Sequence, residues 1–567
     1  MNITKKYTLA LSLLLFAGML RGNNIRVASV TLNGKDLGAG SNNVANTTFI
    51  QFDLSWENSW RANNAANWDA AWVFAKYRIT GGNWRHAWLS NTGHVIPTGF
   101  KADAGLLDPG AAYHRSNNPG LGVFIYRSEN GFGNNSLSNV KLKWNHGAHG
   151  IPDNAIVDIQ VFAVEMVYVP QGSFYVGSGG TDGGSFTDGS WISGPTIPFQ
   201  ISSEASVGID NAAGKLWGIS SIGGTSIGNV AADAEATLSA AFPKGYAAFY
   251  CMKYEISQGQ YRDFLNTLTR DQQVNRVSMD GNIGTYAGGY LWNVSSWSAT
   301  ESIDLISPEH RIGLRMIQDP GGSSPMIFAC DLTESVTLPS DVNQSDDGEW
   351  IAMGQLSWSD NCAFLDWAGL RPLTELEYEK ACRGTQYPVS NEFAWGTTSS
   401  TPADDIVNSG ANNEGTSTSN ANAVFGDRVN VFGPLRVGAF AAGSTNRVQS
   451  GATFYGIMEM TGNVYERCVT LGNEAGRSFT GRHGNGLLHT DGSANVDFWP
   501  GINGNASTTT ANAAFGGTSG VTAAAGSGFR GGAWIDPALS VSNRGGAGTT
   551  LDRRQPDWGG RGVRNAP

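Results

Sequence analysis

The sequence predicts an α+β protein in which an all-β sandwich precedes a loop-rich region with short helices. The first observation is a series of segments between residues 24 and 159 that alternate apolar and polar side chains, with turns rich in glycine and asparagine between them. The second observation is a set of helix-start signals beyond residue 164, among stretches rich in glycine, serine and threonine.

The strand patterns are clearest in three segments. In residues 50–56 every second side chain is apolar, and residues 72–78 and 122–127 are further strand candidates. Short strands at this spacing are typical of a β-sandwich. Core packing is the favoured role for the tryptophans of this region, whereas Trp60 and Trp68, in an Asn-rich loop, are candidates for stacking on a carbohydrate.

Helix-start signals mark the second region. Ser257 with Gln260, and Thr374 with Glu377, form capping-box patterns, in which each side chain bonds the backbone N–H of the other. The first pair predicts a helix that continues with apolar residues to 268, and the second lies in a helix candidate at 370–384. Residues 357–367 are predicted to form another helix.

Length and charge limit the possible functions. A chain of 567 residues predicts two or three domains. The net charge of −11, without a run of basic residues, argues against a nucleic-acid partner. Residues 1–22 have a basic start and an apolar stretch too short for a membrane span, which predicts a signal peptide and secretion to the extracellular space or cell surface. No other segment is a transmembrane candidate. The expected domains are therefore 23–164, the sandwich, and 165–567.

The five cysteines are widely spaced and include no C-x-x-C pair, so a zinc knuckle is not predicted. Their odd number leaves at least one unpaired within a monomer. Cys362 and Cys382 lie in predicted helices and are expected to be buried thiols.

Several motifs beyond residue 164 occur together and in order. They are Val-Pro-Gln-Gly-Ser-Phe-Tyr-Val-Gly177, the segment 370–384, Gly-Asn-Val-Tyr-Glu466, Phe-Arg-Gly-Gly-Ala-Trp534 and Arg-Gly-Val-Arg564. Together they resemble the formylglycine-generating enzyme, or sulfatase-modifying factor, family. The resemblance implies a variant of the C-type lectin fold for residues 165–567.

The resemblance also identifies what this chain lacks. Family members that oxidise a substrate cysteine carry two cysteines after the Gly-Gly pair, and a thiolate pair suits Cu(I) because both are soft. This chain has Asp536 and Val541 at those positions. A carboxylate is a hard donor and valine cannot ligate, so a catalytically silent domain is predicted.

Calcium is the cofactor that the resemblance implies. The ligands carried over from relatives are the side chains of Glu459 and Glu466 with the carbonyls of Gly462 and Val464, and a second site would use Asn412 and Asn413. Such oxygen donors are those that Ca²⁺ prefers. The alternative is that Glu466 pairs with an arginine such as Arg530. The arginines Arg530, Arg544, Arg561 and Arg564 are expected to be structural, bridging loops to buried carboxylates such as Glu375 or Glu466.

C-type-lectin-like folds contact ligands through their C-terminal strands and loops. In this chain the candidate ligand-binding residues are Asp536, Asn543, Asp552, Arg553, Asp557 and Trp558. Planar and charged groups of this kind suit a protein or glycan. Some family members also resemble the variable proteins of diversity-generating retroelements, whose variation lies in this tail.

These observations predict a secreted, non-catalytic protein that binds a protein or glycan or assembles at a surface. Two alternatives stay open. One is a metal-dependent oxidoreductase whose ligands are placed differently, and the other is a structural subunit of an extracellular filament or surface layer, for which self-association is required.

Overall fold

The structure is a computed structural model that describes residues 24–63, 66–106, 119–218, 236–277, 310–333, 341–426, 430–441, 446–501, 520–548 and 551–567. The predicted signal peptide, residues 1–22, lies outside these described residues. Within the described ranges, no helix has the length and apolar character that crossing a membrane requires.

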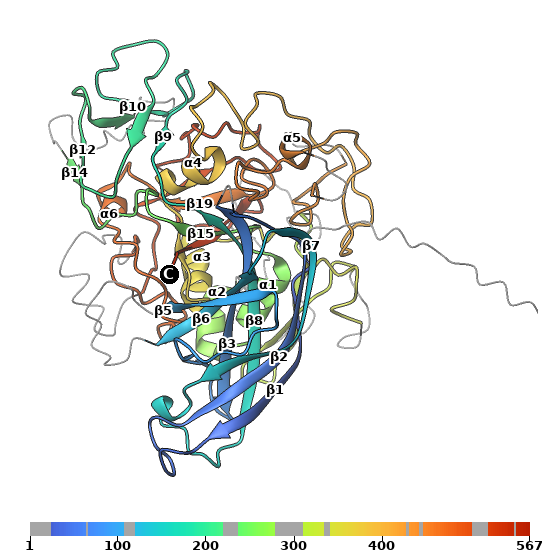
Figure 1. Ribbon diagram of the computed structural model, residues 1–567. Coiled ribbons are helices and arrows are strands. Elements are labelled where there is room, and N and C mark those ends of the chain that lie inside the picture. Colours follow the sequence, from blue (N-terminus) through green and yellow to red (C-terminus); the bar gives the residue numbers. More distant parts are fainter. Residues whose placement is uncertain are drawn as a thin grey trace, which may run out of the picture.

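The amino-terminal region is all-β, as predicted, and its long strands extend away from the loop-rich remainder (Figure 1). One layer contains β1 (Arg26–Asp36), β2 (Thr47–Ala62) and β7 (Gly131–Trp144). The other contains β3 (Asn67–Ile79), β4 (Arg85–His86), β5 (Phe100–Leu106), β6 (Gly120–Arg127) and β8 (Val157–Val169). A 3-10 helix, η2 (Gly147–His149), follows β7. Side chains of both layers meet in one core, which includes Phe52 of β2 and Leu142 of β7.

Strand β3 serves two cores because successive side chains of a strand point to opposite faces. Ala71, Val73 and Ala75 pack in the core of the amino-terminal region. Trp72 and Phe74 face the other way, into a core shared with the C-terminal region. Both faces of this strand are therefore buried, and each face contributes apolar side chains to a core.

The two regions share one sheet. Strand β8 pairs antiparallel with β3 and with β15 (Phe249–Met252), and β15 pairs with β22 (Gly562–Asn565). Strand β18 (Arg371–Pro372) completes the series beside β22. Residue 164, the predicted domain boundary, lies inside β8, so the backbone passes from one region to the other without leaving the sheet.

The C-terminal region consists of short elements joined by long loops. Its helices are α1 (Gln258–Leu265), α2 (Arg270–Arg276), α3 (Trp358–Trp367), α4 (Glu375–Arg383), α5 (Arg447–Ser450) and α6 (Glu474–Arg477). Its remaining strands are β9 (Phe174–Val176), β10 (Phe186–Asp188), β11 (Phe199–Ile201), β12 (Val207–Ile209), β13 (Leu216–Gly218), β14 (Ala236–Leu238), β16 (Leu314–Gln318), β17 (Ile327–Cys330), β19 (Tyr465–Val469), β20 (Ser527–Arg530) and β21 (Trp558–Gly559).

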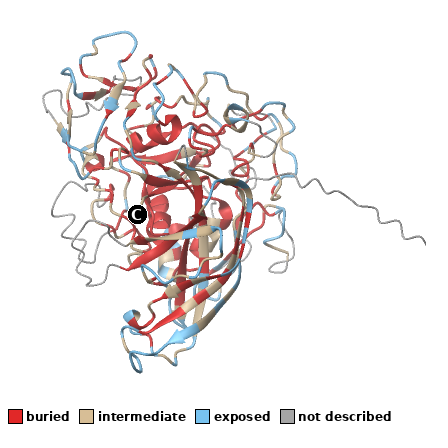
Figure 2. Ribbon diagram, in the orientation of Figure 1, coloured by how far each residue is buried: buried red, intermediate tan, exposed pale blue. Residues whose placement is uncertain are grey.

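The capping boxes predicted at Ser257 and Thr374 are both present, and they start α1 and α4. The first predicted helix is shorter than expected, because α1 ends at Leu265 and Thr269 starts α2 with a capping box of its own. Every residue of α3 and α4 is buried. These helices lie in the buried centre of the molecule, and the exposed segments surround them (Figure 2).

The two tryptophans considered for carbohydrate stacking lie in strands rather than in the predicted loop, Trp60 in β2 and Trp68 in β3, and both are situated between the regions. Trp68 stacks on Tyr168, with ring centroids 4.0 Å apart, and its indole N–H donates to Tyr250. The Trp60 ring lies 4.9 Å from the ammonium of Lys253. Trp68 therefore packs the amino-terminal strands against β15, and Trp60 packs them against Lys253, the residue that follows β15.

Candidate functional site

The cysteines offer no accessible thiolate. All five are unpaired and buried. Burial raises the pKa of each thiol above its ordinary value, to about 12 for Cys330 and Cys382. Because the thiolate is the nucleophile and the metal ligand, these side chains are unreactive near neutral pH.

The two positions that hold cysteines in cysteine-oxidising relatives differ in environment. The Val541 side chain is buried, its N–H donates to the Glu392 carbonyl at 2.8 Å, and its carbonyl accepts from Arg530 at 2.7 Å. Asp536 is partly exposed, and its carboxylate accepts a hydrogen bond from the Tyr465 hydroxyl. One position is therefore part of the core and the other lies at the surface.

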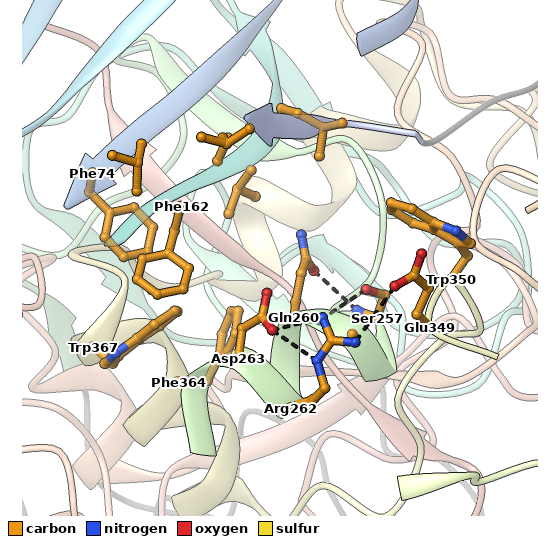
Figure 3. Close-up of a pocket in the computed structure, with 16 residues that line it drawn as sticks. Phe74, Phe162, Ser257, Gln260, Arg262, Asp263, Glu349, Trp350, Phe364 and Trp367 are labelled. Atoms are coloured by element: carbon orange, nitrogen blue, oxygen red, sulfur yellow. Dashed lines mark hydrogen bonds and ion pairs between the residues drawn. The ribbon is translucent and has the colours of Figure 1, made fainter. Parts of the chain in front are cut away.

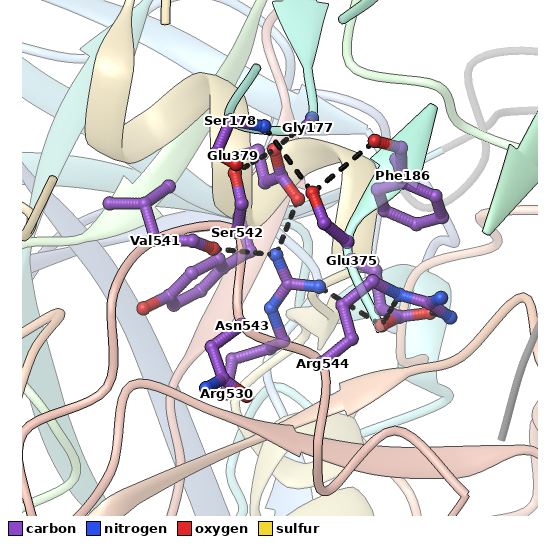
Figure 4. Close-up of polar contacts among 12 residues, drawn as sticks. Gly177, Ser178, Phe186, Glu375, Glu379, Arg530, Val541, Ser542, Asn543 and Arg544 are labelled. Atoms are coloured by element: carbon purple, nitrogen blue, oxygen red, sulfur yellow. Dashed lines mark hydrogen bonds and ion pairs between the residues drawn. The ribbon is translucent and has the colours of Figure 1, made fainter. Parts of the chain in front are cut away.

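A fully buried ion-pair network supports this part of the chain (Figure 4). Arg530, at the end of β20, donates to Glu375 at 3.1 Å and to Glu379 at 2.6 Å. Arg544 makes a two-point contact with Glu375. Arg383 donates to Glu379 from the same helix. The network joins α4 to the C-terminal loops, so the predicted structural role of Arg530 and Arg544 is confirmed.

The remaining two arginines are also buried within the fold. Arg561 donates to Glu466 at 2.6 Å, so Glu466 pairs with Arg561 and not with Arg530, the example named from the sequence. Arg564 donates to the backbone carbonyls of Gly369 and Leu106. It therefore joins the two regions through carbonyls rather than through a carboxylate.

The predicted calcium loop lies in a cluster of three buried carboxyl groups. Glu459 accepts from the Gly438 N–H at 2.9 Å, and its second oxygen has no hydrogen-bond partner. Glu466 also has one buried oxygen without a partner. Glu255 accepts from the Asn463 amide and, at 3.1 Å, from the Val464 N–H. Burial raises the pKa of all three, and the charge of Glu466 raises those of the other two further.

This cluster has an excess of negative charge. Burial of carboxylates is costly unless cations or hydrogen bonds compensate for it. The Arg561 guanidinium contacts Glu466, whereas Glu459 contacts a backbone N–H. The two oxygens without partners belong to residues predicted as calcium ligands, and Gly462 and Val464 lie in the bend that precedes β19. Oxygen donors of this kind are those that Ca²⁺ prefers. Within the described residues, however, no group of three or more histidine, cysteine, aspartate or glutamate side chains is arranged to hold a metal ion, so calcium at this loop stays a prediction.

Asn412 and Asn413, the predicted second site, lie in a separate turn closed by a hydrogen bond from the Glu414 N–H to the Ala411 carbonyl. The Glu414 carboxylate pairs with Arg311 and also accepts the backbone N–H groups of Gly410 and Arg436. Because both its oxygens have such partners, the second calcium site gains no support from this neighbour and stays a prediction.

The predicted ligand-binding residues divide into exposed and buried groups. Asp552 and Arg553 are exposed, and Asp552 accepts from the Ser359 N–H at 3.0 Å. Asn543 is partly exposed and accepts from the Gly545 N–H. Asp557 and Trp558, by contrast, are only 8% and 6% exposed.

Asp557 and Trp558 pack beneath the exposed residues of the C-terminal segment. The Trp558 ring packs on Phe529, with centroids 4.5 Å apart, and the Arg467 guanidinium lies over Trp558 at 4.6 Å. Burial, together with the charge of Asp536, raises the pKa of Asp557 to about 7. The structure therefore groups Asp536, Tyr465 and Asp557, and of this group Asp536 and Tyr465 are partly exposed.

A pocket of about 180 Å³ lies between the two regions (Figure 3). Its aromatic side consists of Phe74, Phe162, Phe364 and Trp367, and these face Arg262, Asp263 and Glu349. Arg262 already pairs with Asp263 and Glu349, at 2.8 and 3.6 Å. Most small-molecule sites measure about 300–1,000 Å³. The pocket therefore supports no ligand assignment.

Glu255 is the residue of the carboxyl cluster that sequence reasoning missed. It follows β15 in the segment 249–256, whose side chains other than Lys253 and Glu255 are apolar or aromatic, and buried charges are unusual in such a segment. The contrast between this carboxyl group and its mostly apolar neighbours was the signal that the sequence contained. It shows that Glu255 is buried with partners, but it cannot show that those partners lie about two hundred residues further along the chain.

Comparison with known proteins identifies a family match. The family described as "Sulfatase-modifying factor enzyme 1-like domain" matches residues 221–566. The structure of PvdO from Pseudomonas aeruginosa is similar, with 16% sequence identity over 71% of this chain and 95% of that chain, and a TM-score of 0.27. No curated protein matches. The family match covers more than half of the sequence and includes the motifs around Glu466 and Arg530, and the chain belongs to the sulfatase-modifying factor enzyme 1-like family.

Proposed function

We propose that this protein is a secreted, non-catalytic binding protein whose C-terminal region, a C-type-lectin-like variant, recognises a protein or glycan. The main support is the pair of positions that would carry the copper-binding cysteines. Asp536 occupies one of them, and Val541, buried in the core, occupies the other. The buried thiols elsewhere, with raised pKa values, do not replace that pair.

The exposed tail supports a binding role. Asp536, Asn543, Asp552 and Arg553 present charged and amide groups at the surface, while Trp558 and Arg467 pack beneath. Groups held by a rigid layer lose less conformational entropy on binding than groups on a free loop. Asp557 and Trp558 then act by supporting the surface rather than by contacting the ligand.

Calcium has a structural role in this proposal. The carbonyls of Gly462 and Val464 and the unpartnered oxygens of Glu459 and Glu466 would hold the ion. It would neutralise the carboxyl cluster behind β19, the strand that Tyr465 starts. The ion would therefore fix the base of the binding surface rather than take part in a reaction.

Binding to a printed glycan array and to a random-peptide display library, with calcium present, tests the proposal. The variant Asp536→Ala/Arg553→Ala removes one charge of each sign from the proposed surface. The matched control, Arg78→Ala/Asp158→Ala, removes an exposed ion pair from the amino-terminal region. We expect at least a tenfold loss of affinity for the first variant and none for the control.

Three results would contradict the proposal in different ways. Equal affinities for both variants would place the binding site elsewhere. Copper-dependent conversion of a cysteine peptide to formylglycine would show that the protein is an oxidoreductase. Regular filaments or sheets in electron micrographs of the purified protein, without glycan or peptide binding, would favour the structural subunit.

A further inference from the structure

Three charged side chains from neighbouring strands converge at the junction of the two regions. Asp69 lies on β3 and Glu165 on β8, and Lys253 directly follows β15. The Lys253 Nζ lies 2.9 Å from Glu165 Oε2 and 3.2 Å from Asp69 Oδ2. The backbone fixes this arrangement, because Lys253 N–H donates to the Glu165 carbonyl at 2.8 Å and β3 pairs with β8 throughout.

Water is excluded from this triad. The side chains of Lys253, Asp69 and Glu165 are 3%, 0% and 1% exposed. The rings of Trp60 and Tyr254 lie 4.9 and 5.3 Å from Lys253 Nζ. In such a site an amine and a carboxyl group stay in contact without competing water, and an amide that forms between them is protected from hydrolysis.

The two carboxyl groups are held differently. Asp69 Oδ1 accepts from the Ser59 hydroxyl at 2.7 Å and from the Trp60 N–H at 3.1 Å, and Oδ2 accepts from the Trp56 indole at 3.2 Å. Fixed donors on Oδ1 are what stabilise an oxyanion when a nucleophile adds to the carboxyl carbon. Glu165, in contrast, has one buried oxygen without a partner. Asp69 is therefore arranged as the acyl group and Glu165 as the proton carrier.

We propose that Lys253 and Asp69 form an intramolecular isopeptide bond, with Glu165 as the residue that transfers the protons. The Lys253 amine adds to the carboxyl carbon of Asp69, and the new C–N bond forms. The C–Oδ2 bond breaks, and this oxygen leaves as water. The product is a secondary amide, and no oxidant or other co-reactant is needed.

The protons balance within the triad. The starting state contains one ammonium and two carboxylates, with a net charge of −1. Moving one proton from Lys253 through Glu165 to Asp69 gives a neutral amine, a carboxylic acid and one carboxylate, again with a net charge of −1. A second amine proton follows the same route to the leaving oxygen. Burial raises the pKa of Glu165 to about 7, whereas, despite burial, the charges of Glu165 and Asp69 raise the pKa of Lys253 above its ordinary value, so the ammonium is the stable starting form. The 2.9 Å contact between Lys253 Nζ and Glu165 Oε2 provides the path for the first proton.

Lys76 provides a matched control within the same sheet. Like Lys253, Lys76 is buried, but it lies on β3. Its Nζ donates to the backbone carbonyls of Trp367 and Gly486, at 2.7 and 2.8 Å. Backbone amides do not acylate an amine under these conditions. The triad therefore differs from an ordinary buried lysine in placing a carboxyl group, with its own oxyanion donors, beside the nitrogen.

The bond would join β3 to the residue after β15, across the intervening β8. It would link the amino-terminal sandwich covalently to the C-terminal region, independently of the ligand that the latter binds. A cross-link between residues so far apart in sequence restricts the unfolded chain strongly, which stabilises the folded state.

Mass spectrometry of the intact, denatured, mature protein tests the proposal, with its first residue established by peptide mapping. We expect a mass lower by one water than the sequence gives, and a branched proteolytic peptide that joins Asp69 to Lys253. Lys253→Arg and Asp69→Ala should show the full mass, and Lys76→Arg should keep the loss. Glu165→Gln, checked for folding by circular dichroism, should also show the full mass.

A full mass for the unmodified protein would overturn the proposal and leave the triad as a buried salt bridge. A branched peptide that joins Lys253 to Glu165 would overturn the assignment of Asp69. Loss of water in a folded Glu165→Gln variant would overturn the role of Glu165 in proton transfer. The wild-type measurement decides the main question even if a variant does not fold.

Discussion

Arg544 makes a two-point contact with Glu375: Nε donates to Oε1 at 2.7 Å and Nη2 donates to Oε2 at 2.9 Å. Both side chains are completely buried, and they lie 169 positions apart in the sequence. Glu375 starts α4, and Arg544 belongs to the loop after β20. The pair therefore fixes the C-terminal loops, which include the proposed binding surface, to a buried helix.

Substitution of Glu375 should destabilise the protein severely. Glu375→Gln keeps the size of the side chain but leaves Arg530 and Arg544 as buried cations with one fewer carboxylate. Breaking one side of a buried pair costs about 3–5 kcal/mol. Urea unfolding monitored by tryptophan fluorescence measures this loss.

The exposed pair Arg78–Asp158 is the control for that prediction. Its side chains are 40% and 46% exposed, and solvent screens such pairs, so Arg78→Ala should cost less than about 1 kcal/mol. Similar losses for Glu375→Gln and Arg78→Ala would show that burial does not determine the strength of these contacts.

The parts of the fold that the sequence predicted depend on local signals. Capping boxes join residues three positions apart, and they located the starts of α1 and α4. Alternation identified β2 and β3. The pairing of β15 with β8 on one side and with β22 on the other was not predicted, because a strand pattern shows which face is buried but not which distant strand lies beside it.

Prediction of the candidate site was limited in the same way, because local sequence signals do not identify distant partners. The sequence indicated that its C-terminal arginines meet buried carboxylates, because unpaired buried charges are unfavourable. It could not show that Glu466 meets Arg561, or that Glu255 joins the cluster, because these contacts depend on how β15, β19 and the chain end pack together. Nothing in the sequence around Trp558 indicated that its side chain is buried beneath the proposed binding surface.

Calcium should stabilise the protein, and acid should weaken its binding. Burial raises the pKa of Glu459 to about 7. Below that pH the carboxyl group holds a proton that calcium must displace, so affinity should fall about tenfold per pH unit for one proton displaced. Isothermal titration calorimetry at pH 8 and pH 6 measures the difference, and thermal unfolding with and without chelator measures the stabilisation.

Glu459→Gln should abolish the calcium-dependent increase in melting temperature. Asn412→Ala separates the two predicted sites, since it should leave calorimetric binding at the Glu459 site intact. A melting temperature at pH 8 that does not respond to chelator would contradict the calcium assignment for the first site.

Asp557 should make the folded state less stable as pH rises. Its pKa increases from the ordinary 3.8 to about 7 in the folded protein, because of burial and the charge of Asp536. Between these two values the folded state holds a proton that the unfolded chain releases, so stability from this group falls from about pH 4 to pH 7. Asp557→Asn, which stays neutral, should flatten this part of the profile of urea midpoint against pH.

A second substitution tests the cause of that shift. Asp536→Asn removes the neighbouring charge while keeping the size of the side chain, so the pKa of Asp557 should move down toward its ordinary value. The upper limit of the pH range over which stability falls should then move to a lower pH, while the lower limit stays the same. Identical profiles for the wild type and Asp557→Asn would assign the pH dependence to other buried carboxyl groups.

The cysteines should be unreactive in the folded protein and fully reactive after unfolding. All five are buried and unpaired, and burial disfavours their thiolates. A chromogenic disulfide reagent should therefore detect no thiol in the native state and five thiols in guanidinium chloride. A rapidly reacting native thiol would identify an accessible cysteine and strengthen the oxidoreductase alternative. Fewer than five after unfolding, restored by a reductant, would show that the protein contains a disulfide. The expected result instead supports a domain that belongs to the family by sequence but has no accessible thiol for copper.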